Sequence, residues 1–236
     1  MSEDIRQYLQ ECAASYGIAV SDGQAEQFQW YMELLIEWNQ KMNLTAITEP
    51  KAVVVKHFLD SILLLPELEQ GDTLIDVGTG AGFPGVVAKL YRPEIDLTLM
   101  EPTGKRVEFL RRLCERLDIT ADVVKERAEE AARKQWRETF DVATARAVAA
   151  LPALAEYCLP LVKVGGWFIT MKGANAEEEM ESAAGAVKKL GAVLEKELSF
   201  VLPDNSLRSL IFYRKVSPTP PAYPRNGGKI AKAPLR

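Results

Sequence analysis

The stretch that decides the fold is Leu74-Ile75-Asp76-Val77-Gly78-Thr79-Gly80-Ala81-Gly82-Phe83-Pro84-Gly85. The residues before the first glycine, 73–77, are apolar or β-branched apart from one acid, which predicts a buried strand. Pro84 suits the first turn of a helix, which we expect to end near Tyr91. Glycine fits the turn between them because a Cβ would obstruct both the bend and a closely bound ligand. The free N–H groups at the helix start favour an electron-rich group of that ligand.

One class of ligand that fits this turn is a dinucleotide. Gly80, Gly82 and Gly85 spell GxGxxG. Glu101 follows Gly80 by 21 residues, near the spacing of the ribose-binding acid in NAD enzymes. On this pattern alone the sequence would indicate an NAD-dependent oxidoreductase.

The alternative pattern is acid-x-Gly-x-Gly, in which Asp76 precedes Gly78 and Gly80, as is typical of enzymes that use S-adenosylmethionine (SAM). A carboxylate at the strand tip would repel the pyrophosphate of NAD but attract the sulfonium and ammonium groups of SAM. At an effective dielectric constant of about 20, like charges some 4 Å apart repel by roughly 4 kcal/mol. Asp76 therefore favours SAM, while a role limited to capping the turn stays open.

The composition is that of a globular protein with one large domain. The chain has 236 residues, of which 47% are hydrophobic and 26% charged. No apolar run approaches the roughly 18 residues that span a bilayer, and residues 1–6 are too charged for a signal peptide. We therefore expect a cytoplasmic protein with no membrane partner. One histidine and three cysteines without a CxxC pair predict neither a metal site nor a disulfide framework.

The C-terminal end is basic although the net charge is −4. Residues 205–236 contain no acid and seven basic side chains: Arg208, Arg214, Lys215, Arg225, Lys229, Lys232 and Arg236. This asymmetry predicts a contact with a polyanion, with a merely solvated tail as the alternative. From residue 217 on, the many prolines and glycines predict a loose tail.

The first 66 residues are predicted to be helical and to pack on the core. Ser21 and Gln24 resemble a capping box. After it, apolar residues recur at spacings of three and four on one helix face: Phe28, Tyr31, Leu35, Trp38 and Met42. A second helix, starting near Thr48 and Pro50, carries His57, for which we expect a structural or interface role, with a catalytic or RNA contact as the alternative.

From residue 67 to 216 the pattern alternates between strand and helix, which predicts an α/β domain with a mostly parallel sheet. The expected strands are 73–77, 96–101, 121–125, 140–146 and 167–171, followed by an antiparallel pair at 193–200 and 207–215. Such a closing pair favours a SAM-dependent methyltransferase sheet over a dinucleotide-binding one. Ligands of open parallel sheets bind beyond the carboxyl ends of the strands. Those ends carry Asp76 to Phe83, Glu101, Ala128 and Glu129, Arg146, and Lys172.

Several short motifs occur together in the order and context of one known family. They are Asn43-Leu44-Thr45, His57-Phe58-Leu59-Asp60-Ser61, the glycine stretch, Gly104-Lys105-Arg106, Ala128-Glu129, Thr144-Ala145-Arg146-Ala147, Lys172-Gly173 and Tyr223-Pro224-Arg225. From about Gln40 to its end the chain resembles the RsmG (GidB) family of bacterial 16S rRNA guanine-N7 methyltransferases. Each motif alone is weak, but the set is specific.

The resemblance implies a class I SAM-dependent methyltransferase fold, preceded by the helical segment and followed by the basic tail at 217–236. It implies SAM as cofactor, held at Gly78, Phe83, Ala128, Glu129 and Arg146. Our own strand-end argument adds Asp76 and Gly80, together with Glu101 as acceptor of the ribose hydroxyls. A helix-capping role for Glu129 and a solvated strand-end role for Glu101 stay open.

The implied reaction is methylation of N7 of a guanosine in 16S rRNA. N7 carries a lone pair and no proton, so no general base is expected and catalysis would come from positioning. We expect Arg146 and Lys172 to grip the nucleotide and Arg225 to contact RNA, with a solvated Lys172 as the alternative. The expected partner of this monomer is 16S rRNA, the small ribosomal subunit or an assembly intermediate. A non-catalytic RNA-binding assembly factor is the remaining alternative to a methyltransferase or oxidoreductase.

Overall fold

The computed structural model describes residues 3–236, which are built around one seven-stranded sheet. The strands are β1 (Thr73–Val77), β2 (Asp96–Met100), β3 (Asp122–Val124), β4 (Phe140–Arg146), β5 (Val162–Lys172), β6 (Ala192–Val201) and β7 (Leu207–Lys215). Their order in the sheet is β3-β2-β1-β4-β5-β7-β6. The first five strands are parallel, whereas β7 lies antiparallel between β5 and β6. The predicted class I methyltransferase topology is therefore confirmed.

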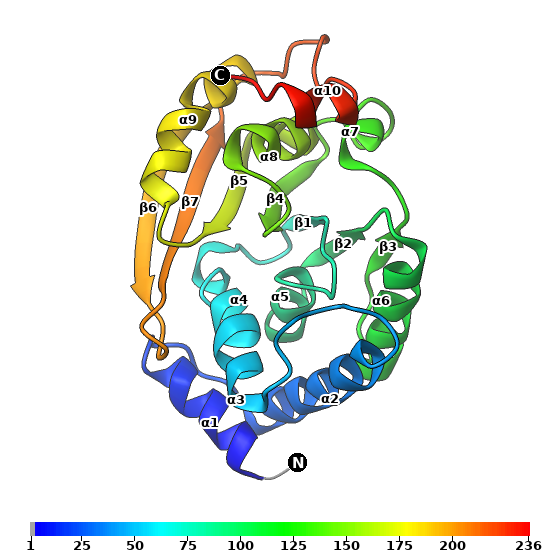
Figure 1. Ribbon diagram of the computed structural model, residues 1–236, viewed down its shortest axis with the longest axis vertical. Coiled ribbons are helices and arrows are strands. Elements are labelled where there is room, and N and C mark those ends of the chain that lie inside the picture. The colour runs from blue at the N-terminus through cyan, green and yellow to red at the C-terminus, as the bar shows by residue number, and fades with distance from the viewer. Residues whose placement is uncertain (1–2) are drawn as a thin grey trace.

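Helices cover both faces of the sheet (Figure 1). One face packs against α1 (Glu3–Ala14), α2 (Asp22–Asn39), α3 (Pro50–Val53), α4 (Asp60–Ile62), α5 (Gly85–Tyr91) and α6 (Gly104–Leu117). The other face packs against α7 (Ala128–Ala131), α8 (Leu151–Cys158) and α9 (Ala176–Lys189), and α10 (Gly227–Lys232) lies beside α8. Figure 1 shows the N-terminal helices and the C-terminal segment at opposite ends of the molecule.

Alternation along β1 explains how one strand serves two hydrophobic cores. Leu74 belongs to the core on the side of α5, whereas Ile75 and Val77 belong to the core on the side of α8. Side chains on a strand point to opposite faces in turn. Asp76 therefore points toward α5, away from the face that Val77 occupies.

The N-terminal helical segment reaches the glycine turn. The predicted capping box is confirmed, because Ser21 Oγ accepts from Gln24 N at 3.3 Å and Gln24 Oε1 accepts from Ser21 N at 3.0 Å. Tyr31 is fully buried on the predicted apolar face of α2, and its hydroxyl donates to Ala81 O at 2.6 Å. The segment thus shares the core with the sheet and holds the glycine turn from one side.

The second predicted helix contains an unexpected change of geometry. It begins after Glu49, whose carboxylate caps Lys51 N and Ala52 N, and a π-helical turn at Val54–Leu59 separates α3 from α4. Two 3₁₀ turns, Leu65–Glu67 and Leu159–Leu161, complete the helical elements of the described chain. Wide turns of the π type often occur at functional sites. His57 lies in this turn and Asp60 directly follows it.

Two expectations from the sequence need correction. The fifth strand, expected at 167–171, begins five residues earlier, at Val162, so that Gly165 and Gly166 lie within it. The C-terminal segment is not a loose tail, because Thr219, Ile230 and Leu235 are buried in the body of the protein. Composition misleads here because prolines and glycines also occur in segments that lie extended against a surface.

The three cysteines are buried and unpaired. Among residues 3–236 there is no helix with the length and apolar character needed to cross a membrane.

Candidate functional site

Two neighbouring cavities open at the carboxyl ends of the parallel strands. The first, of about 430 Å³, adjoins the glycine turn and is called the glycine-turn cavity. The second, of about 740 Å³, is called the arginine cavity because Arg146 and Arg208 line it. Val148, Ala149 and Ala150, which follow β4, line both cavities. A small molecule in one cavity and a second molecule in the other would therefore meet at this loop.

The glycine-turn cavity takes residues from five regions of the chain. Its predicted members are Gly78, Ala128 and Glu129. The others are Val77, Met100, Pro102, Glu126, Arg127, Val148, Ala149, Ala150, Ala153, Tyr157, Ala231 and Pro234. The sequence argument missed the contributions of α8 and α10. The run of small residues at 147–150, directly before α8, could have indicated that a ligand approaches the backbone closely there.

The glycine turn has no room for side chains at Gly78. Its φ is +66°, a left-handed value, and an added Cβ would lie 2.8 Å from Val148 Cγ2. Gly80 has a φ of +61° and donates its N–H to Glu101 Oε2 at 3.2 Å. Both glycines thus have a left-handed φ that disfavours a side chain, but an added Cβ would collide only at Gly78, which is also the only one of the two that lines the cavity.

Asp76 lies behind the glycine turn. One oxygen, Oδ2, accepts from Thr79 Oγ1 at 2.6 Å and from Gly85 N at 2.8 Å, so the carboxylate braces the turn from within. The other oxygen, Oδ1, is buried without a hydrogen-bond partner. Burial raises the pKa of Asp76 to about 6, against the opposing effect of those two hydrogen bonds. Asp76 lines neither cavity, and this geometry corresponds to the turn-capping alternative.

Glu101 has a similar position next to the turn. It is buried, and besides Gly80 N it accepts from Thr103 N at 2.8 Å, with Arg106 at 3.8 Å. A solvated strand-end role is therefore wrong. Each carboxylate oxygen has two acceptor positions, so Glu101 retains capacity for a hydroxyl. Its role in binding ribose stays a prediction.

Phe83 does not line either cavity but supports the arginine cavity from below. Its ring stacks on Tyr31, with ring centroids 5.0 Å apart, and on His57, at 4.7 Å. The Arg146 guanidinium lies over the same ring at 4.9 Å, a distance suited to a cation–π contact. Direct contact of Phe83 with a cofactor stays a prediction.

Arg146 is held by the π-helical turn. It donates to Lys56 O at 2.9 Å and to Asp60 Oδ2 at 3.0 Å, and its Nη2 lies 3.2 Å from His57 Nδ1. The same Nδ1 lies 3.1 Å from Lys56 O, and on the other side of the ring His57 Nε2 lies 2.8 Å from Thr45 Oγ1. Burial, reinforced by the Arg146 cation, lowers the pKa of His57 from 6.5 to about 4. His57 is thus a neutral positioning group for Arg146.

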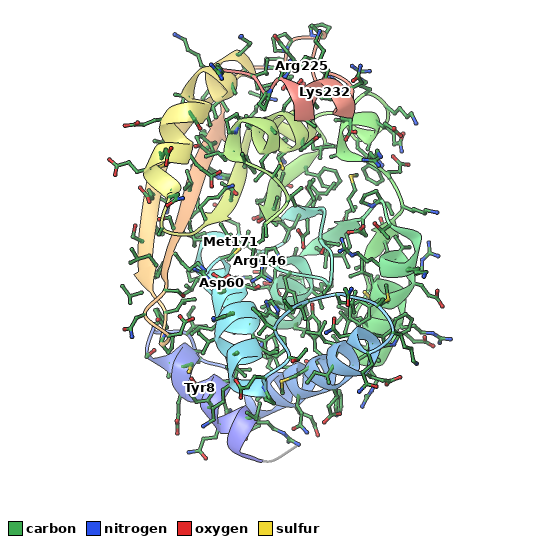
Figure 2. The ribbon with its side chains drawn as sticks, viewed as in Figure 1. Tyr8, Asp60, Arg146, Met171, Arg225 and Lys232 are labelled. Carbon is green, nitrogen blue, oxygen red and sulfur yellow. The ribbon has the colours of Figure 1, made fainter. Side chains whose placement is uncertain are left out.

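Arg208 completes the arginine cavity and was missed by the sequence argument as a site residue. Its Nε donates to Asp60 Oδ1 at 3.1 Å, so one buried carboxylate bridges two arginines. Figure 2 shows Asp60 and Arg146 near Met171 in the middle of the molecule, and all three line this cavity. The pairing of Arg208 with Asp60, 148 residues apart, has no local sequence signal.

Lys172 lies in the arginine cavity but is not free. Its Nζ donates to Glu179 Oε2 at 2.7 Å and to Ala149 O at 3.0 Å, and its side chain is 9% exposed. The solvated alternative is therefore wrong. Because Ala149 lines both cavities, Lys172 fixes the loop between them. Its contact with a nucleotide stays a prediction.

Arg225 lies far from the arginine cavity, on the C-terminal segment at one end of the molecule (Figure 2). Its guanidinium pairs with the fully buried Glu156, at 2.7 Å between Nη2 and Oε2. Arg208 and Lys215 are likewise paired with acids of the body, Asp60 and Glu138. The expected basic arm is thus partly neutralised within the fold, because acids distant in the sequence meet its cations.

Comparison with known proteins places the chain in a family. The family model described as "GidB: rRNA small subunit methyltransferase G" matches residues 24–211. The chain belongs to the GidB family. A relative named ribosomal RNA small subunit methyltransferase G from Lachnoclostridium phytofermentans is 48% identical, over 94% of this chain and 93% of its own. A protein of the same name from Symbiobacterium thermophilum is also 48% identical, over 98% of both chains. The resemblance stated from the motifs is confirmed.

Solved structures support the GidB fold. A methyltransferase from Pyrococcus furiosus matches with a TM-score of 0.55 and 19% identity, covering 81% of this chain and all of that one. The [4+2]-cyclase SpnF matches with a TM-score of 0.56 and 14% identity, covering 82% and 96% of the two chains. At such identities these matches concern the fold alone. Membership of this family decides against an NAD-dependent oxidoreductase. Within residues 3–236, no group of three or more His, Cys, Asp or Glu side chains could hold a metal ion.

Proposed function

We propose that this GidB protein transfers a methyl group from SAM to N7 of a guanosine in small-subunit ribosomal RNA, as a cytoplasmic monomer. The observation that carries the proposal is the pair of cavities joined at residues 148–150. One is small and adjoins a glycine turn, and the other is larger and lined by basic side chains. This arrangement suits a small cofactor and a nucleotide that must meet at one point.

The glycine-turn cavity fits SAM. Its volume lies within the roughly 300–1,000 Å³ of small-molecule sites. Gly78 leaves the space that a Cβ would fill, and Ala128, Ala150 and Ala153 keep the walls close to the backbone. Glu129 and Glu126 supply negative charge beside a ligand that carries positive groups. Asp76 adds a buried charge behind the turn.

SAM, when bound, would supply an electrophilic methyl group on its sulfonium. Guanine N7 has an available lone pair and no proton, so no side chain needs to act as a general base. The neutral His57, with a pKa lowered to about 4, is consistent with this, since it serves to orient Arg146. The task of the protein is then to hold the base in line, which is a large source of rate enhancement.

The arginine cavity fits the nucleotide. Four cations line it, namely Lys56, Arg146, Lys172 and Arg208, against the two acids Asp60 and Glu179. The surplus of positive charge favours a phosphate, and the donors of Arg146 and Arg208 match acceptors on a guanine edge or a phosphate. A base enters such a cavity only from a loop or after flipping out of a helix.

The proposal is tested by incubating the protein with labelled SAM and 16S rRNA or small subunits from cells that lack its gene. The expected result is a single 7-methylguanine, located by borohydride reduction and aniline cleavage. Substrate from such cells is required because rRNA that is already modified would accept no label. Label at another base or another atom of guanine would contradict the N7 assignment, and absence of transfer to both substrates would contradict the substrate class.

A further inference from the structure

We infer that the C-terminal residues 216–236, called the C-terminal strap, form one wall of the cofactor cavity and hold the ring system of the cofactor. Ala231 and Pro234 of the strap line the glycine-turn cavity together with Val77 and Gly78 at the tip of β1. The inference rests on the proposed function, because the ligand of that cavity is taken to be SAM. It replaces the expected role of this segment as an RNA-binding arm.

The first part of the strap is fastened by backbone contacts. Val216 N and Ser217 N donate to Gly191 O at 2.9 and 3.1 Å. The Arg137 guanidinium donates to the carbonyls of Thr219, at 2.6 Å, and Tyr223, at 2.9 Å. Contacts of this kind depend on the path of the strap and not on its side chains, so they fix where it runs.

The middle of the strap is fastened by a buried ion pair. Glu156 of α8 is fully buried, and it accepts from Arg225 N at 2.7 Å, from Nε at 2.9 Å and from Nη2 at 2.7 Å. A buried carboxylate left without its partner is strongly unfavourable. Ala153 and Tyr157, on the same helix, line the cavity. The pair therefore ties the strap to the helix that forms the adjoining wall.

The end of the strap is seated on the cavity itself. Asn226 caps α10 by accepting from Lys229 N at 2.9 Å, and Ile230 is fully buried beneath the helix. Gly227 lies so close to the Glu129 carboxylate that an added Cβ would collide with it. Ile230 points inward, and Ala231 lines the cavity, although it is exposed like Lys229 and Lys232.

The chemistry of this wall suits a flat ring and not a phosphate chain. Ala231 and Pro234 are apolar, and Met100, Ala153 and Tyr157 line the same cavity. Apolar and aromatic side chains gain from covering a heteroaromatic ring such as adenine. We therefore assign the strap to the adenine part of SAM.

The test compares two substitutions of the same type on the same segment. Ala231→Trp places an indole in the cavity, whereas Ala233→Trp changes a residue that is exposed, as Ala231 is, but does not line the cavity. Calorimetry with SAM should give a dissociation constant at least tenfold higher for Ala231→Trp and within twofold of the unmodified protein for Ala233→Trp. Affinity for rRNA, measured without SAM, should be unchanged in both. Adenosine alone should show the same loss with Ala231→Trp as SAM does.

A third variant tests the ion pair. Arg225→Lys keeps the charge but loses the two-pronged contact with Glu156, so the KM for SAM should rise at least fivefold while kcat at saturating SAM stays the same. Unchanged SAM affinity in Ala231→Trp, or lost rRNA affinity in Arg225→Lys, would overturn the inference while leaving the methyltransferase assignment intact. Failure of the unmodified protein to bind SAM would instead overturn both.

Discussion

Gly78 is the residue at which we expect a single added methyl group to weaken cofactor binding. Replacement by alanine would add a Cβ at a φ of +66° and 2.8 Å from Val148 Cγ2, at the junction of the two cavities. We expect Gly78→Ala to reduce SAM affinity at least tenfold, measured by calorimetry. The control is Gly17→Ala, because Gly17 has a φ of +73° with nothing within 4 Å. Both should lose about 1–2 kcal/mol of stability from backbone strain, and equal SAM affinities would refute the steric argument.

His57 makes the stability of the protein dependent on pH. Burial and the Arg146 cation lower the pKa of His57 from 6.5 to about 4. Between pH 6.5 and pH 4, His57 is therefore protonated in the unfolded chain but neutral in the folded protein. The stabilising contribution is therefore complete above pH 6.5 and declines as the pH falls toward 4.

Between pH 7.5 and pH 5 this effect should cost about 2 kcal/mol of unfolding free energy. Urea denaturation at the two pH values should show that the change in unfolding free energy is less favourable by this amount in the unmodified protein than in His57→Asn. Asp76, whose raised pKa of about 6 acts in the opposite direction, is present in both proteins and cancels in the comparison. An equal loss in both proteins would mean that His57 is not the titrating group.

At the scale of elements, the sequence was most informative where the structure is local. The strands at Thr73–Val77 and Phe140–Arg146 and the capping box at Ser21 follow from hydrophobic period and turn chemistry, which act over a few residues. The directions of Asp76 and Glu101 could also have been inferred. Alternation along β1 and β2 places Val77 and Met100 on the cavity side and the acids on the other.

Elements that depend on distant partners were not predictable in this way. The π-helical turn at Val54–Leu59 is stabilised by a hydrogen bond that Arg146, 90 residues further along the chain, donates to Lys56 O. The C-terminal strap resembles a disordered tail in composition, yet the fully buried Glu156 pairs with Arg225 across 69 residues. A short stretch of sequence contains only one partner of each pair. An arginine that is buried in a contact in the folded protein therefore looks, from its neighbours in sequence, like a solvent-exposed charge.

For the molecule as a whole, the two ends of the chain serve different cavities. Lys56, His57 and Asp60 of the N-terminal helices line the arginine cavity. Ala231 and Pro234 of the C-terminal strap line the glycine-turn cavity. The sheet between them supplies the loop 148–150 that both cavities share. We therefore propose a division of labour between the two cavities, with SAM on one side of this loop and the nucleotide on the other.

The measurement that tests this division most directly is a pair of constants for Arg208→Gln: the dissociation constant for SAM and the KM for 16S rRNA. Arg208 lines only the arginine cavity, and Asp60 keeps Arg146 as its partner when Arg208 is replaced. We expect the dissociation constant for SAM to stay within twofold of its value in the unmodified protein. The KM for rRNA should rise at least tenfold, the reverse of the pattern expected for Gly78→Ala. A SAM constant that rises as much as the KM for rRNA would contradict the separation of the two sites.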